Sequence, residues 1–183
     1  MTLIDVRSAL QASVSGGYSD LVTRKTGAVV RTLIEHQISG LADGTVVFLD
    51  FSRIGVLDRS CADEFVAKLM MPLSRDRGDH NGYVVFHGIS DDHLETIEAV
   101  LETHGLALVV QFGSSTKLVG AVTNEERCCW DLVMTHGSVI AETVAVHTGV
   151  PDEACRALLE SLARRRLLRR DADRFLPLGS ALA

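Results

Sequence analysis

The residues best suited to chemistry in this chain follow a β-branched, apolar stretch that predicts a buried strand from Thr45 to Phe51. Apolar residues then recur at helical spacing, at Ala62, Phe65, Val66, Leu69 and Met70. The helix opens on polar residues, with Asp58 as one N-cap and Ser60, three residues before Asp63, as another. Free N–H groups at a helix start favour anions or the acidic group of a partner, so this segment predicts either a binding surface or an ordinary strand-loop-helix unit.

A second group with chemical potential is basic and lies near the C-terminus: Arg164, Arg165, Arg166, Arg169, Arg170 and Arg174. Asp171 and Asp173 are the only acids among residues 164–174, so the local charge is +4. The preceding helix carries Arg156 with three acids, Asp152, Glu153 and Glu160, on its outer side, which disfavours insertion into a DNA groove. We therefore expect either a phosphate grip by Arg156, Arg164, Arg165, Arg169, Arg170 and Arg174, led by the arginines of the wing, Arg169 and Arg170, or simply a solvated face.

Patterns typical of enzymes are missing from the sequence. It has no Gly-x-Ser-x-Gly elbow, no phosphate-binding glycine loop and no His-x-x-x-His pair. Two groups contain residue types that bind metals, but their spacing does not favour a metal site: His80, His87, Asp91, Asp92 and His93 after a strand, and Cys128, Cys129, His136, His147 and Cys155 among helices. We expect no catalytic residue, no metal and no cofactor.

The segment after the strong strand resembles the STAS domain of anti-sigma-factor antagonists, and more closely STAS-like relatives. Asp50-Phe51 and the run Ser60-Cys61-Ala62-Asp63-Glu64-Phe65 carry this resemblance. In the antagonists an Asp precedes a phosphorylated Ser, a small residue and Gly. Asp58 matches that Asp, but Arg59 stands at the acceptor position and Cys61 replaces the Gly. We expect no phosphorylation at 59 and at most weak modification of Ser60.

The resemblance implies a protein partner, such as an ATP-binding anti-sigma factor or a histidine-kinase-like protein. The docking residues implied are those of the strand end and helix start: Asp50, Asp58, Arg59, Ser60 and Asp63. It also implies a STAS-like mixed sheet with covering helices.

Alternating strand and helix signals extend over residues 1–112 and predict an α/β domain. Besides the strong strand we expect strands at 3–6, 21–23, 83–87 and 106–112 and helices at 27–38, 60–72 and 91–104, with a solvated loop at 74–81.

Residues 113–124 begin with Gly-Ser-Ser and predict a linker. The remainder, 125–183, predicts helices at 125–135, 139–147 and 152–166 and then a ribbon over 167–178. This part resembles a winged helix-turn-helix, with Ala145, Gly149, Cys155 and Leu158 at the positions where the second and third helices pack. We therefore expect a small C-terminal winged-helix domain.

Composition limits the function classes. The chain has 183 residues, a net charge of −6, and 46% hydrophobic and 23% charged residues, as expected of a globular protein. No run is long and apolar enough for a membrane span, no secretory signal is expected, and unpaired cysteines indicate a cytoplasmic protein.

The sequence therefore predicts a non-enzymatic cytoplasmic regulator, in which a STAS-like domain binds a protein and a winged-helix-like domain provides the output. The alternative is a DNA-binding transcription regulator whose STAS-like domain dimerises or senses a ligand. A homo-oligomer stays open in both cases.

Overall fold

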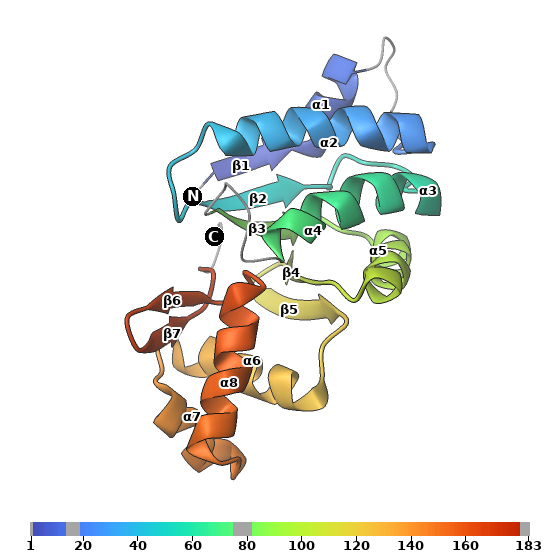
Figure 1. The fold of residues 1–183 in the computed structure, drawn as a ribbon. Coiled ribbons are helices and arrows are strands. Elements are labelled where there is room, and N and C mark those ends of the chain that lie inside the picture. The colour runs from blue at the N-terminus through green and yellow to red at the C-terminus, as the bar shows by residue number, and fades with distance from the viewer. Residues whose placement is uncertain (1, 14–18, 75–81, 180–183) are drawn as a thin grey trace.

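A five-stranded sheet forms the centre of the molecule in the computed structural model, which describes residues 2–13, 19–74 and 82–179 (Figure 1). The strands lie side by side in chain order. The first four are parallel and the fifth is antiparallel to the fourth. Their bounds are β1 Thr2–Asp5, β2 Val46–Asp50, β3 Tyr83–His87, β4 Ala107–Phe112 and β5 Ser115–Gly120. The predicted α/β class is thus confirmed, with a mixed sheet.

One face of the sheet is covered by the helices that connect the parallel strands. They are α1 Val6–Ser13, α2 Arg24–Ser39, α3 Arg59–Ala62, the π-helical turn η1 Asp63–Ala67, α4 Lys68–Leu73 and α5 Asp91–His104. Local signals set the ends of α5: Ser90 forms a capping box, and Gly105 closes the helix in the left-handed conformation. The segments α3, η1 and α4 follow one another without a break and match the helix expected over 60–72.

The other face is covered by the C-terminal third of the chain, which lies below the sheet in Figure 1. Its elements are α6 Asn124–His136, α7 Ala141–Thr148, α8 Asp152–Arg164 and a ribbon of β6 Arg169–Asp171 and β7 Arg174–Leu176. Helices α7 and α8 pack on each other, and the Thr148 hydroxyl lies 3.4 Å from the Cys155 sulfur. The three helices and the ribbon are therefore formed where the sequence predicts them.

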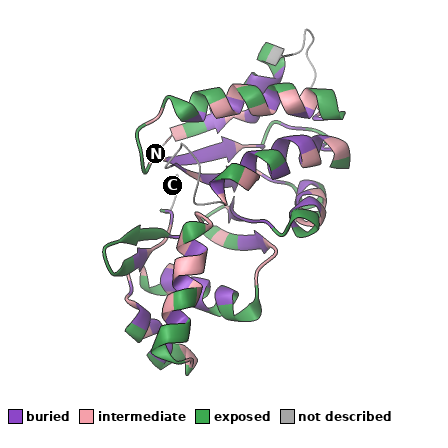
Figure 2. Ribbon diagram, viewed as in Figure 1, coloured by how far each residue is buried: buried purple, intermediate pink, exposed green. Residues whose placement is uncertain are grey.

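Side chains of the central strands alternate between two separate cores, as the period of two in a strand requires. In β2, Val47 and Leu49 point into the core beneath α2 and α5, whereas Val46 and Phe48 point into the core beneath α6 and α8. Burial of both faces explains why β2 is apolar from Val46 to Leu49 (Figure 2). The C-terminal helices therefore share a core with the sheet.

The prediction of a linker over 113–124 differs from the structure. This segment contains β5, whose residues pair with β4 along its whole length. Gly113 has a positive φ of 56° and turns the chain back, and Leu118 and Val119 are buried on opposite faces of the sheet. A short hairpin turn can resemble a flexible linker in sequence because both are built from Gly and Ser.

Smaller differences concern the N-terminal region. Helix α1 was not predicted, and the strand expected at 21–23 is a single bridge between Leu21 and Leu57. The loop expected at 74–81 lies outside the described residues beyond Ser74. No helix among residues 2–13, 19–74 and 82–179 is long and apolar enough to cross a membrane.

Candidate functional site

Asp58 organises the segment that the sequence analysis singled out. It is the N-cap of α3, and its Oδ1 accepts hydrogen bonds from the Cys61 N–H at 2.7 Å and the Ser60 hydroxyl at 2.8 Å. Its Oδ2 accepts from the Thr23 N–H at 2.9 Å. Burial opposes ionisation of this carboxyl, but the N–H donors of Thr23 and Cys61 outweigh it and lower its pKa. Asp58 thus joins the starts of α2 and α3 as a carboxylate.

Helix α2 packs closely on α3 at Gly27. A Cβ atom at this position would lie 2.8 Å from the Cys61 carbonyl oxygen and 3.1 Å from the Glu64 Cβ. Any larger residue would push the two helices apart, because the nearest of these contacts is backbone. The close approach brings Arg24 and Arg31 of α2 against the acids of η1.

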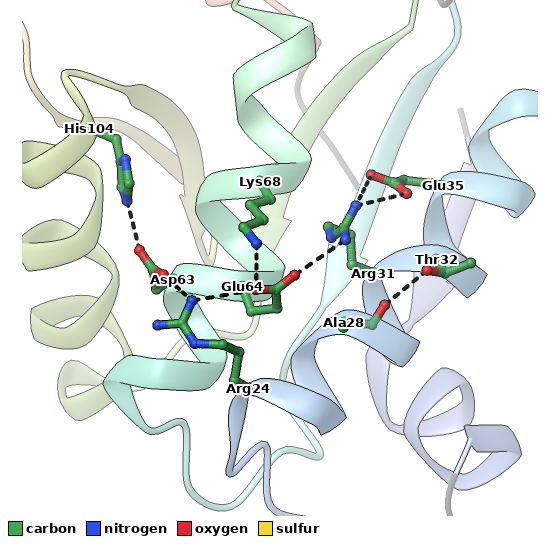
Figure 3. A network of polar contacts seen from close by, with 9 residues as sticks. All are labelled: Arg24, Ala28, Arg31, Thr32, Glu35, Asp63, Glu64, Lys68 and His104. Carbon is green, nitrogen blue, oxygen red and sulfur yellow. Dashed lines mark hydrogen bonds and ion pairs between the residues drawn. The ribbon is translucent and has the colours of Figure 1, made fainter.

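Those acids form the network drawn in Figure 3. Glu64 is 5% exposed and binds Lys68 at 2.6 Å, Arg31 at 3.3 Å and Arg24 at 3.5 Å. Asp63 binds the His104 Nε2 at 2.7 Å and Arg24 at 2.9 Å. The network therefore connects α2, η1 and α5, and it lies on a π-helical turn, a rare structure that is frequent at functional sites.

We expect Glu64→Gln to lower the free energy of unfolding by about 2 kcal/mol at neutral pH. The substitution removes the carboxylate charge that pairs with Arg24, Arg31 and Lys68, and the partial exposure of these three bases limits its cost. The hydrogen bond from Lys68 is the main cause of the lowered pKa of Glu64. Because the pKa of Glu64 is lowered in the folded protein, its ionised carboxylate stabilises the fold at pH values above 4.5, the usual pKa. This stabilisation is lost as the pH falls through the lowered pKa.

Urea unfolding of wild type and Glu64→Gln from neutral to acid pH checks this expectation. The difference between the two proteins should shrink as the pH falls below about 4.5, and a difference independent of pH would contradict it.

Three of the predicted docking residues line one shallow pocket of about 370 Å³: Arg59, Ser60 and Asp63. Arg24, Val100 and Thr103 complete its lining. Arg59 is exposed, and its guanidinium lies 3.5 Å from the Thr103 hydroxyl. Two other predicted residues do not line the pocket: Asp58 accepts a hydrogen bond from the lining residue Ser60, and Asp50, at the end of β2, accepts from the Ser52 N–H at 2.8 Å.

Two exposed apolar residues are close in the sequence to Arg24 and Arg59 of this pocket. Val56 is 54% exposed and Val22 is 39% exposed. They belong to the two segments that Asp58 and the Leu21–Leu57 bridge hold together. We call the pocket lining together with Val22 and Val56 the α3 surface.

The groups near the α3 surface are poorly suited to nucleophilic chemistry. Burial raises the pKa of the Cys61 thiol to about 12, and Asp58, which accepts from the Ser60 hydroxyl, is a weak base because its pKa is lowered. A phosphate on Ser60 would lie beside the ionised Asp58, which is unfavourable.

The described residues hold no group of three or more His, Cys, Asp or Glu side chains placed to bind a metal ion. His93, one of the histidines of the first candidate metal group, is buried, and its Nε2 lies 2.8 Å from the Gly55 carbonyl oxygen. His80, from the same group, is outside the described residues.

The arginines predicted to contact nucleic acid fall into two groups. Four are bound to protein groups: Arg156 to Glu142, Arg165 to Glu126 at 3.1 Å, Arg174 to Ser138 at 2.7 Å and Arg170 to the Ala172 carbonyl at 2.9 Å. The others, Arg164 and Arg169, are exposed. The structure therefore leaves fewer of these charges available than the sequence suggests.

Sequence reasoning missed Arg24 and His104 as partners of Asp63. Each is about 40 residues from Asp63 along the chain, with separations of 39 and 41 residues, so no local pattern signals the contact. It also missed Tyr83, which lies beneath the Arg166 guanidinium, 5.7 Å from the ring centre. An arginine next to a helix end gives no hint of an aromatic partner on a distant strand.

Comparisons of the chain with protein-family models, with curated proteins and with solved structures found no match.

Proposed function

We propose that this chain is a non-enzymatic regulatory protein that binds a protein partner through the α3 surface. On this proposal the sheet and helices α1 to α5 form a STAS-like unit, and the C-terminal helices and ribbon form a winged-helix-like unit that provides the output. The partner is of the ATP-binding anti-sigma or histidine-kinase-like type, as the resemblance of the segment 50–65 implies.

The observation that carries the proposal is the meeting of Arg59, Ser60 and Asp63 in one pocket with Arg24. Asp58 and Asp63 are held in place by hydrogen bonds and ion pairs, so the surface is preorganised. Arg59 is an exposed charge at its rim, as is Arg24, which is paired with Asp63. Charged rims set the rate and specificity of association, while exposed apolar residues such as Val56 supply contact area.

We expect Arg59→Glu to weaken partner binding about tenfold without unfolding the protein. The first turn of a helix tolerates an acid, and exposed charge changes usually alter stability by about 0.5 kcal/mol or less. The measurement is biolayer interferometry of the full chain against an anti-sigma or kinase-like ATPase encoded in a neighbouring reading frame.

The matched control is Arg169→Glu, the same charge change at an exposed residue of the ribbon. It should leave the affinity for the partner within about twofold, since it is outside the α3 surface. Equal affinities of wild type and a folded Arg59→Glu protein would remove the α3 surface from the proposal.

A DNA-binding regulator is the second candidate. Its support is the ribbon, where all of β6 is exposed and carries Arg169 and Arg170. Against it, Arg156 is paired with Glu142, so the outer side of α8 offers no unpaired base beside Asp152 and Glu153. We therefore place protein binding first.

A further inference from the structure

A pocket of about 420 Å³ lies between the start of β3 and the end of α8. Its lining is basic and aromatic: Tyr83, Glu160, Ala163, Arg164, Arg166 and Arg170. The volume falls in the range of small-molecule sites. Three guanidinium groups and one carboxylate leave a net charge of +2 around it. Neither the resemblance nor the proposed function uses this pocket.

The backbone at Arg166 is unusual. Its φ is +59°, a left-handed conformation that glycine adopts freely and other residues rarely do. Arg166 follows the end of α8, where such a residue commonly closes a helix. This conformation accompanies the contact of its guanidinium with the ring of Tyr83, 5.7 Å from the ring centre. The side chain is thereby held at the pocket wall.

The other two arginines approach from separate elements. Arg164 is exposed in the last turn of α8. Arg170 lies on β6, where its Nε donates to the Ala172 carbonyl at 2.9 Å and its guanidinium lies 3.5 Å from Glu160. Guanidinium groups bind phosphate oxygens through paired N–H donors, and a cluster of them is a common phosphate site. Tyr83 and Ala163 add apolar surface beside these charges.

We propose that this pocket binds a small phosphomonoester, with its phosphate on Arg164, Arg166 and Arg170 and its organic part against Tyr83 and Ala163. A compact ligand fits the charge distribution better than a nucleic acid does. A long polyanion would also meet Asp171 and Asp173 in the ribbon turn and Asp152 and Glu153 on α8, whereas a small phosphate reaches only the pocket.

The test is isothermal titration calorimetry of the full chain with phenyl phosphate, inorganic phosphate and a mixed-sequence DNA duplex. We expect phenyl phosphate to bind more tightly than inorganic phosphate, because of the contact with Tyr83. Arg166→Gly and Arg164→Ala should each weaken phenyl phosphate binding about tenfold, the usual effect of losing one charge-assisted hydrogen bond.

Arg166→Gly removes the guanidinium without introducing backbone strain, because glycine accepts the positive φ. Arg169→Ala is the matched control: it removes a neighbouring exposed arginine that does not line the pocket and should change the affinity less than about twofold. The proposal fails if phenyl phosphate does not bind, if Arg169→Ala weakens it as much as Arg166→Gly, or if only the duplex binds.

Discussion

A fragment of residues 1–121 is expected to aggregate when it is produced without the C-terminal elements. Its sheet would be complete, but one face would lose its cover, exposing Val46, Phe48, Val85, Ala107, Val109 and Leu118. Burying a large apolar side chain contributes roughly 1.5–3 kcal/mol, so uncovering this face costs about 10 kcal/mol. That is comparable with the total stability of an ordinary domain. Size-exclusion chromatography and binding of a hydrophobic dye, compared with the full chain, measure the effect.

The matched control is the same fragment with Val85→Lys and Val109→Lys. These changes place two charges at the centre of the uncovered face, so this fragment should be more soluble and bind less dye. A fragment 1–121 that is monomeric and binds no dye would show that the sheet does not depend on its C-terminal cover. The division at residue 112 predicted from sequence would then describe two independent domains.

Trp130→Ala is expected to lower the free energy of unfolding by about 3–5 kcal/mol. Trp130 is 2% exposed in the core beneath α6 and α8, and its indole N–H donates to the Leu167 carbonyl at 3.1 Å. The substitution leaves a large cavity and an unpaired carbonyl. Because this core includes Phe48 and Val109 of the sheet, we expect one cooperative unfolding transition at lower denaturant concentration.

Trp130→Phe serves as the control, because it keeps most of the ring and removes only the hydrogen bond. Its cost should be about 1–2 kcal/mol. Chemical unfolding followed by far-ultraviolet circular dichroism reports both variants without relying on tryptophan fluorescence. Two separated transitions in Trp130→Ala, with the first confined to helical signal, would contradict the shared core.

The protein-binding and phosphate-binding proposals make separable predictions. Arg59 and Arg166 belong to different pockets, one beside α3 and one beside α8. Arg59→Glu should therefore leave the affinity for phenyl phosphate unchanged, and Arg166→Gly should leave the affinity of the α3 surface for its protein partner unchanged. A change in partner affinity when phenyl phosphate is added would connect the two sites.

Strands and helices were largely predictable from this sequence because their signals are local. The β-branched run predicts β2, and the helix expected at 91–104 matches α5. The candidate N-caps Asp58 and Ser60 were also visible, although the sequence did not choose between them. Tertiary structure chose Asp58, whose second carboxylate oxygen accepts from Thr23, 35 residues earlier.

Tertiary structure decided which charges of the C-terminal basic run are available. Arg164 and Arg165 are neighbours in a basic run. Arg165 nevertheless binds the buried Glu126, which lies 39 residues earlier in the sequence, whereas Arg164 is exposed. The same holds for Glu64, whose ion pairs with Arg24 and Arg31 depend on the close contact of α2 with α3 at Gly27, whereas its pair with Lys68 is local. Residue type and spacing determine helix, strand and cap through neighbours within a few positions. Long-range ion pairs, pockets and the cover of a sheet face form between distant segments, so they exist only once the chain has packed.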